Sequence, residues 1–136
     1  MTTDQKKRLL PYVLGEKKPE LVLKNARVID VFTKIVRSGD IAVQEGRIVG
    51  VGSYDGETET DLRGNYVAPG FIDAHVHLES SMASPALFAR KVLPCGTTTV
   101  IADPHEIVNV VGLEGLEYML EASKNAAVNI YFVLPS

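Results

Sequence analysis

The sequence of 136 residues contains a single cysteine, Cys95, and this scarcity excludes an internal disulfide. A chain that needs no disulfide fits a reducing compartment, so we expect a cytoplasmic location. A lone cysteine is more typical of a small packing residue than of a nucleophile, and we assign Cys95 no chemistry.

Long hydrophobic runs and strong net charge are also missing. No apolar stretch approaches the roughly 18 residues that a membrane-spanning helix needs. The charged start, Met1–Arg8, is followed by no long apolar run and is unlike a secretory signal. The formal net charge is only −3. We therefore expect no membrane partner and no nucleic-acid partner.

The composition that is present, 46% hydrophobic and 23% charged, is that of an ordinary globular domain. Residues 1–19 form the first segment of the chain. Helical spacing of apolar residues predicts a helix over residues 4–14, although Pro11 disfavours it unless the proline lies in the first turn. Lys17–Pro19 has the character of a linker.

Residues 20–68 show a β pattern, with short apolar runs, tight turns and no helix between them. Gln44–Gly46 predicts a hairpin turn in which Gly46 supplies a positive φ, and Asp55–Gly56 predicts a second turn. We expect a small antiparallel β-domain, and we find no ligand cluster in it. The predicted strands cover residues 21–23, 26–31, 34–36, 40–43, 47–51 and 62–67.

The chain then changes period at Pro69–Gly70, where a new strand begins. Alternation places Phe71, Asp73, His75 and His77 on one face of this strand. The opposite face is wholly apolar, from Ile72 to Leu78, and can pack beneath helices. A strand with one polar and one apolar face suits the inside of a parallel barrel.

The rest of the chain predicts a β-α-β-α-β order. Ser84 and Pro85 open a helix over residues 85–93, and a strand follows at residues 97–102. A second helix is expected at residues 112–125 and a third strand at 128–134. Right-handed crossovers make the three strands parallel. The inward-facing helix residues are expected to be Leu87, Phe88, Val92, Leu113, Leu116 and Leu120.

Parallel strands bring their carboxyl ends to one rim, where barrel enzymes keep their chemistry. His75 and His77 lie two residues apart, roughly 6–7 Å along the strand, and neutral imidazoles are common ligands of divalent metals. A bare His-x-His also arises by chance, and two histidines cannot complete a catalytic site that needs at least three protein ligands. The rim residues are His75, His77, Glu79, Asp103, His105, Glu106 and Ser136.

Each of the other polar residues near the rim has two possible roles. Asp73 either orients an imidazole or forms a strand-end hydrogen bond. Glu79 either contacts substrate or metal or is a solvated loop carboxylate. The turn that contains Asp103 and His105 has two interpretations. It binds an accessory metal or the substrate in the first, and in the second it caps a helix together with Glu106.

Three stretches carry a family resemblance. Pro69–His77 resembles the first-strand signature of the metal-dependent amidohydrolase superfamily. Leu78–Met82 and Ala102–Ile107 resemble the adenine deaminase family within it, and the resemblance extends from about Leu21 to Ser136. It implies an α/β fold: the amino-terminal part of a (β/α)8 amidohydrolase barrel, with three strands and two helices in residues 69–136. The barrel would be incomplete in this chain, and residues 20–68 would form the small β-domain before it.

The resemblance also implies an activity: conversion of adenine and water to hypoxanthine and ammonia, a step of purine metabolism, through attack by metal-activated hydroxide. It implies a divalent metal held by His75 and His77, with manganese or iron favoured and zinc compatible. The remaining ligands and the main catalytic acid or base are expected beyond Ser136. We expect the chain to be a fragment that is inactive alone, and the intact enzyme to be a homo-oligomer.

Two other functions stay open at this point. One is cyclic amide hydrolysis of the dihydroorotase or hydantoinase kind, within the same superfamily. The other is a binding or assembly module without catalysis. The residues alone support a metal site on a βα rim, and the substrate rests on the resemblance.

Overall fold

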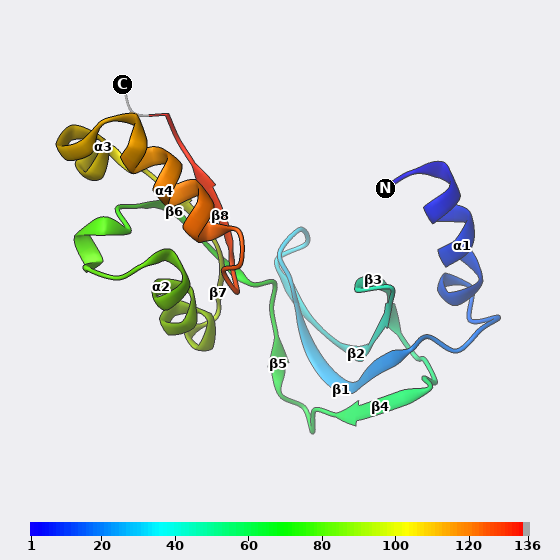
Figure 1. Ribbon diagram of the computed structural model, residues 1–136. Helices are drawn as coiled ribbons and strands as arrows, with labels where there is room; N and C mark the ends of the chain where they lie inside the picture. The colour runs from blue at the N-terminus through cyan, green and yellow to red at the C-terminus, as the bar shows by residue number, and fades with distance from the viewer. Residues whose placement is uncertain (135–136) are drawn as a thin grey trace. The chain divides into compact units, whose positions relative to one another are not determined.

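The computed structural model describes residues 1–134 and divides the chain into two units, Met1–Pro69 and Gly70–Ser136 (Figure 1). The first unit contains α1 (Thr3–Val13), β1 (Leu21–Asp30), β2 (Ile35–Gln44), β3 (Arg47–Gly52), β4 (Thr58–Asp61) and β5 (Tyr66–Val67). The second contains β6 (Phe71–Val76), η1 (Glu79–Ser81), α2 (Pro85–Val92), η2 (Leu93–Cys95), β7 (Thr97–Ala102), α3 (His105–Val111), α4 (Leu113–Ser123) and β8 (Asn129–Phe132). Within residues 1–134, no helix has the length and apolar character to cross a membrane.

Helix α1 begins with a reciprocal cap. The Thr2 hydroxyl accepts the Gln5 amide at 3.2 Å, and the Gln5 side chain accepts the Thr2 amide at 2.8 Å. The helix predicted over residues 4–14 is present, and it continues through Pro11 although this proline lies outside the first turn. Because α1 ends at Val13, the missing amide of Pro11 removes a hydrogen bond only from the last turn.

The sheet of the first unit has the order β3-β2-β1-β4, with β5 also paired to β1. The strand pairs β1–β2 and β2–β3 are antiparallel, but β4 and β5 both run parallel to β1. The prediction of a purely antiparallel domain is therefore wrong for β4 and β5. Their pairing is a long-range contact that neighbouring turn residues do not specify. The predicted hairpin turn is present, with positive φ at Glu45 (52°) and Gly46 (64°).

Several predicted strand boundaries also change. The two runs on either side of Asn25 form one strand, β1, whose register shifts between Leu23 and Ala26. Asn25 takes a positive φ of 56° at this bulge. Strand β2 likewise joins two predicted strands. Residues 62–65, predicted as strand, form a turn in which the Asn65 amide donates to the Leu62 carbonyl at 2.9 Å.

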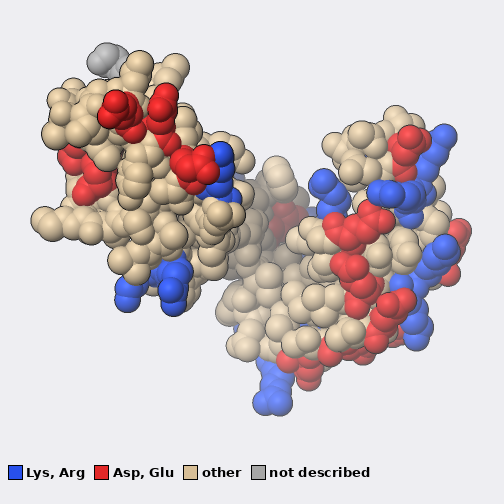
Figure 2. All heavy atoms as spheres, viewed as in Figure 1, with Lys and Arg blue, Asp and Glu red and all other residues tan. Residues whose placement is uncertain are grey.

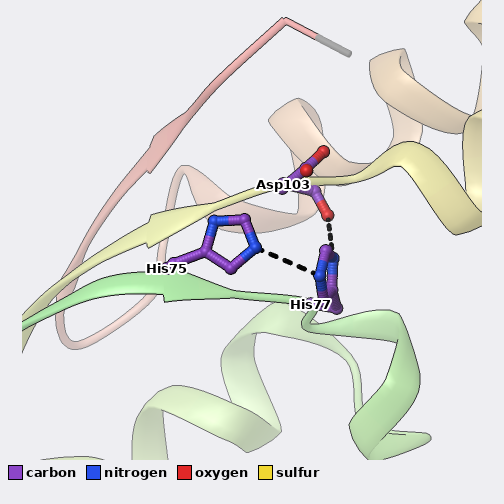
Figure 3. A group of neighbouring side chains, drawn as sticks. All are labelled: His75, His77 and Asp103. Atoms are coloured by element: carbon purple, nitrogen blue, oxygen red, sulfur yellow. Dashed lines mark hydrogen bonds between the residues drawn. The ribbon is translucent and has the colours of Figure 1, made fainter. Parts of the chain in front are cut away.

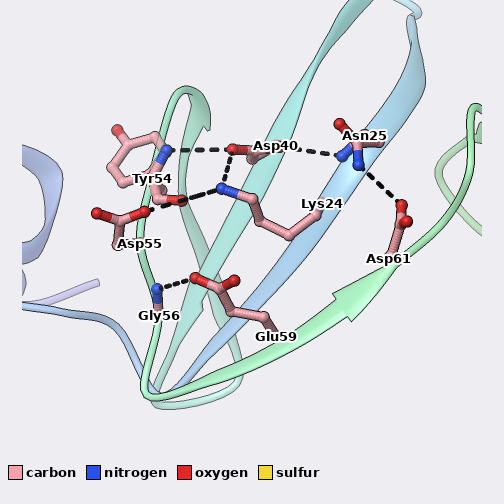
Figure 4. A network of polar contacts seen from close by, with 8 residues as sticks. All are labelled: Lys24, Asn25, Asp40, Tyr54, Asp55, Gly56, Glu59 and Asp61. Atoms are coloured by element: carbon pink, nitrogen blue, oxygen red, sulfur yellow. Dashed lines mark hydrogen bonds and ion pairs between the residues drawn. The ribbon is translucent and has the colours of Figure 1, made fainter.

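One buried carboxylate joins the strands of this sheet to the loop after β3 (Figure 4). Asp40 is 8% exposed and accepts hydrogen bonds from the backbone amides of Asn25 (3.0 Å) and Tyr54 (3.3 Å). Lys24 Nζ pairs with the same carboxylate at 2.8 Å and donates to the Tyr54 carbonyl at 2.7 Å. Burial opposes ionisation of Asp40, but these donors outweigh it and lower the pKa of the carboxyl below its usual value.

The sheet of the second unit has the order β6-β7-β8, and all three strands are parallel as predicted. Its core is the fully or nearly fully buried cluster of Leu78, Ala102 and Met119. Side chains from α2, α3 and α4 all pack on this cluster, so the three helices cover one face of the sheet. The partly buried residues around it are Val76, Phe88, Ile107, Ile130 and Phe132.

The helices of this unit differ from the prediction in two ways. Helix α3 was not predicted, and α4 buries Gly115 and Met119, whereas Leu113 is 73% exposed. The glycine explains the difference, because a Cβ on Gly115 would lie 2.8–3.0 Å from side-chain atoms of Val111 and Ile107. The close approach of α3 thus turns the glycine face of α4 inward and leaves Leu113 and Leu120 exposed, whereas Leu116 is half-buried. The inward stripe predicted for α2 also changes: Leu87 is 47% exposed, while Pro85 and Ala89 are buried.

Strand β6 keeps only part of its predicted alternation. Its register against β7 shifts between Phe71 and Ile72 and again between Asp73 and Val76. Ile72, expected on the covered face, is 67% exposed, whereas Val76 and Leu78 pack in the core. The helices therefore cover β6 only at its carboxyl end, where the candidate site lies.

Candidate metal centre

Two histidine rings face one another where β6 ends (Figure 3). The Nε2 atoms of His75 and His77 are 3.2 Å apart, and the ring centroids are 4.8 Å apart in an edge-to-face arrangement. Two ligands held at about 2.1 Å from one ion lie roughly 3.0 Å apart at a right angle and 3.4 Å apart at a tetrahedral angle. The pair therefore has the spacing of two ligands that share one cation.

The tautomer of His77 follows from its second nitrogen. His77 Nδ1 lies 2.9 Å from the backbone carbonyl of Asp103, and a carbonyl only accepts, so Nδ1 carries the hydrogen (Figure 3). A neutral ring protonated at Nδ1 has its lone pair at Nε2, which is the nitrogen that faces His75. Metal-binding histidines commonly donate their other nitrogen in this way, because the bond fixes the ring and raises its basicity.

Asp103 holds a second imidazole with its side chain. Its Oδ2 lies 3.1 Å from His105 Nδ1, and the His105 ring packs edge-on against His77 with centroids 4.6 Å apart. The hydrogen bond from His105 lowers the pKa of the Asp103 carboxyl below its usual value, against the opposing effect of burial. The other oxygen, Asp103 Oδ1, is buried and has no hydrogen-bond partner among the described residues.

Two hydrogen bonds join the turn after β6 to the start of α3. Ser80 Oγ donates to Glu106 Oε2 at 2.7 Å, and the Ile107 amide donates to Glu79 Oε1 at 3.3 Å. Glu79 Oε2, like Asp103 Oδ1, is buried without a partner in the described part of the chain. The turn is therefore ordered by contacts between residues that lie far apart in the sequence.

The structure gathers most of the residues that the sequence analysis selected. His75, His77 and Asp103 form one group whose candidate ligand atoms all lie within 4.8 Å of one another. Asp73 lies outside both such groups of the described residues, and its Oδ1 accepts the His75 amide at 3.2 Å. Ser136 lies outside the described residues.

A second group with the same spacing contains His77, His105 and Glu106. The sequence analysis treated Glu106 only as a rim or capping residue and assigned Ser80 no role in the site. The available signal was the position of Glu106 directly after His105 at the end of a predicted strand. The contact from Ser80 could not be found this way, because it joins residues 26 positions apart.

Comparison with known proteins places this chain in a family. A family model described as the amidohydrolase family matches residues 66–136. Adenine deaminase 2 of Desulfotalea psychrophila is 52% identical over 136 residues, which is 100% of this chain and 24% of that protein. Adenine deaminase 2 of Carboxydothermus hydrogenoformans is 56% identical over 130 residues, covering 96% of this chain and 23% of that protein. The chain thus spans about a quarter of the length of these relatives.

Solved structures show the same fold. An L-hydantoinase (dihydropyrimidinase) from Arthrobacter aurescens aligns with a TM-score of 0.61 and 21% identity, covering 83% of this chain and 27% of that one. An N-acyl-D-glutamate deacylase from Bordetella bronchiseptica, solved with zinc and a phosphonate inhibitor, aligns with a TM-score of 0.50 and 28% identity over 63% of this chain and 19% of that one.

The second unit is a parallel βα unit with paired imidazoles at its carboxyl rim. The chain belongs to the amidohydrolase family, and the resemblance drawn from its sequence is confirmed.

Proposed function

We propose that the protein to which this chain belongs is an adenine deaminase, which converts adenine and water to hypoxanthine and ammonia. The identity of 52–56% to named adenine deaminases carries this proposal, because it extends over nearly the whole chain and includes the rim. The hydantoinase neighbour is only 21% identical, so it supports the fold and does not favour cyclic amide hydrolysis as the reaction.

The chain's share of the reaction is to hold part of the metal site. His75 and His77 present two nitrogens 3.2 Å apart, one of them with its tautomer set by Asp103, and this donor set fits manganese, iron or zinc. An ion bound there would lower the pKa of a bound water molecule towards neutrality. Manganese or iron stays our preference, and further ligands and the main acid or base would come from elsewhere in the protein.

The organisation of the whole protein is part of the same proposal. Residues 69–136 would be the first three strands of a (β/α)8 barrel, with residues 20–68 as a β-domain and residues 1–19 as a helix and linker. The parallel order β6-β7-β8 with helices on one face supports the barrel assignment. The cytoplasmic location and the homo-oligomeric state also stay predictions.

The test is an adenine assay on the full-length protein, purified, stripped with a chelator and reloaded with Mn²⁺. We expect hypoxanthine and ammonia in equal amounts, and no turnover before the metal is returned. His75→Asn and His77→Asn should each lower turnover by more than about 100-fold, since even outer-shell changes cost 10–100-fold. Glu117→Gln, on the exposed side of α4, is the control and should turn over normally.

The proposal fails if the reloaded protein leaves adenine intact. Hydrolysis of a dihydropyrimidine or hydantoin ring under the same conditions would then support the cyclic amide hydrolase instead. Full metal loading and activity in both histidine variants would remove His75 and His77 from the site.

A further inference from the structure

The sequence contains a single Asp-Gly dipeptide, Asp55 and Gly56, and no Asn-Gly. The dipeptide lies between β3 and β4, outside both strands. The carboxyl carbon of an aspartate can be attacked by the backbone nitrogen of the next residue, which closes a five-membered succinimide ring. Glycine permits this attack best, because it has no side chain beside the nitrogen and its backbone rotates most freely. Asp55 is therefore the aspartate of this sequence for which the reaction is least hindered.

The fold requires the glycine of this dipeptide. A Cβ on Gly56 would lie 2.7 Å from Cγ2 of Val22 and 2.9 Å from the carbonyl oxygen of Thr58. Val22 is fully buried in β1, and β4 pairs with the same strand, so neither neighbour has room to move. A larger residue at position 56 would shield the nitrogen but would also overpack this contact. The packing of β1 thus keeps the reactive dipeptide in place.

The side chain of Asp55 is open to water and loosely held. It is 80% exposed, and its ion pair with Lys24 Nζ spans 4.0 Å. The following strand, β4, lies at the edge of its sheet. Figure 2 shows acidic side chains exposed on the side of the first unit that carries β4, and residues 57–61 are all exposed. The carboxyl group is therefore free to turn towards the backbone, and water can reach it.

The backbone nitrogen of Gly56 is bonded to a side chain rather than to the sheet. Its amide donates to Glu59 Oε1 at 3.0 Å (Figure 4). The next two amides, of Glu57 and Thr58, donate instead to backbone carbonyls just before β1. A carboxylate within hydrogen-bond reach of a proton can remove it as the new bond forms. Glu59 therefore lies where a general base for ring closure is needed.

We propose that Asp55 and Gly56 form a site of spontaneous backbone isomerisation, at which aspartate becomes isoaspartate. The nitrogen of Gly56 bonds to Cγ of the protonated Asp55 carboxyl. Glu59 takes the amide proton and returns it to the departing hydroxyl, which leaves as water. Water then adds to the backbone carbonyl carbon of residue 55 and breaks its bond to the nitrogen. The mass is unchanged, but the backbone now passes through Cβ and Cγ and is one atom longer.

The added backbone atom would enter a loop that is bonded on both sides. Before it, the Tyr54 amide donates to the Asp40 carboxylate at 3.3 Å, and the Tyr54 carbonyl accepts from Lys24 Nζ at 2.7 Å. After it, the Glu57 amide donates to the Pro19 carbonyl at 2.9 Å. A longer path cannot keep all of these contacts, and the bond from the Tyr54 amide is the longest of them. Isomerisation should therefore release the Tyr54 amide from Asp40.

The test ages the purified full-length protein at neutral pH and body temperature. Isoaspartate would be followed by methyl transfer from an isoaspartyl methyltransferase and by mass spectrometry of peptides. Among peptides from residues 1–136, we expect only the one with Asp55 to split into two elution peaks of equal mass. Asp55→Glu keeps the charge but would need a six-membered ring, so it should lose the signal completely.

Two glutamine variants test the general base. Glu59→Gln keeps an oxygen that can accept from the Gly56 amide but removes the basic group, so isoaspartate should form several-fold more slowly. Glu57→Gln makes the same change of charge on an exposed neighbour and should isomerise at the wild-type rate. Hydrogen exchange read from the two elution peaks of one aged sample tests the effect on the loop: the Tyr54 amide should lose protection only in the isoaspartate peptide.

The proposal is overturned if the aged protein gains no isoaspartate at position 55 while a synthetic peptide of residues 50–60 does, because the fold would then protect the dipeptide. Equal rates in Glu59→Gln and Glu57→Gln would remove Glu59 from the reaction. Equal protection of the Tyr54 amide in both peaks would refute the link to Asp40. None of these measurements uses adenine, so their outcome is independent of the proposed deaminase activity.

Discussion

Replacing Asp40 by alanine should loosen the first unit more than any surface change of the same kind. Asp40, in β2, accepts hydrogen bonds from the amide of Asn25 in β1 and from the amide of Tyr54 in the loop after β3. Alanine removes the acceptor for both amides and the partner of Lys24 at 2.8 Å. The perturbation is therefore the loss of one buried carboxylate with three donors around it.

The size of the effect follows from these contacts. A hydrogen bond to a charged group contributes about 1.5–3 kcal/mol, so two lost amide bonds amount to roughly 3–6 kcal/mol. Breaking a buried ion pair costs about 3–5 kcal/mol. Lys24 keeps its bond to the Tyr54 carbonyl at 2.7 Å and has Asp55 at 4.0 Å, so we do not add a further penalty for its charge. We expect a loss of about 3 kcal/mol, which is a factor of about 100 in the opening equilibrium.

Native-state hydrogen exchange measures this locally. The amides of Asn25 and Tyr54 should exchange about 100-fold faster in Asp40→Ala, while amides of the second unit keep their wild-type rates. Asp55→Ala is the matched control, because its side chain is 80% exposed and it should change exchange little. Equal protection in Asp40→Ala and wild type, or equal loss in both variants, would refute the reasoning.

Three further changes have defined outcomes. Acid should weaken the same network, because the pKa of Asp40 is lower in the folded state than in the unfolded state. The stability that ionised Asp40 contributes is therefore complete above the unfolded pKa near 3.9 and disappears as the pH falls through the folded pKa. Asp40→Asn should flatten this acid part of the stability–pH curve, and an unchanged curve would contradict the role given to Asp40. Leu78→Ala should destabilise the second unit by about 2–5 kcal/mol, since Leu78 is 0% exposed in its core, and the β7 amides should lose protection selectively. Gly46→Ala should lower the free energy of unfolding by about 1–2 kcal/mol. The positive φ alone causes this loss, because nothing lies within 4 Å of an added Cβ. A melting temperature equal to that of the wild type would show that the turn relaxes.

Local signals predicted local structure well. The hairpin at Glu45–Gly46, the cap at Ser84 and the strand at residues 97–102 all depend on residues within a few positions of one another. Helix α3 was not predicted for two reasons. Pro104, directly before it, indicates a turn, and the seven residues of α3 are too few to show a clear hydrophobic period. The inward face of α4 escaped prediction because a glycine, which contributes no hydrophobic signal, sets the approach of α3.

The sequence by itself determined the family, the parallel order of the second unit and the two histidines that face each other at the end of β6. These follow from alternation along one strand, from crossover handedness and from the quoted stretches at residues 69–82 and 102–107. Only the tertiary structure decided that β4 and β5 run parallel to β1, that Asp103 holds both His77 and His105, and that Glu106 joins them. The strand pairings and the contacts to His77 join residues distant in the chain, so their geometry depends on how strands and helices pack. Asp103, His105 and Glu106 are close in sequence, but their side-chain directions depend on the turn before α3.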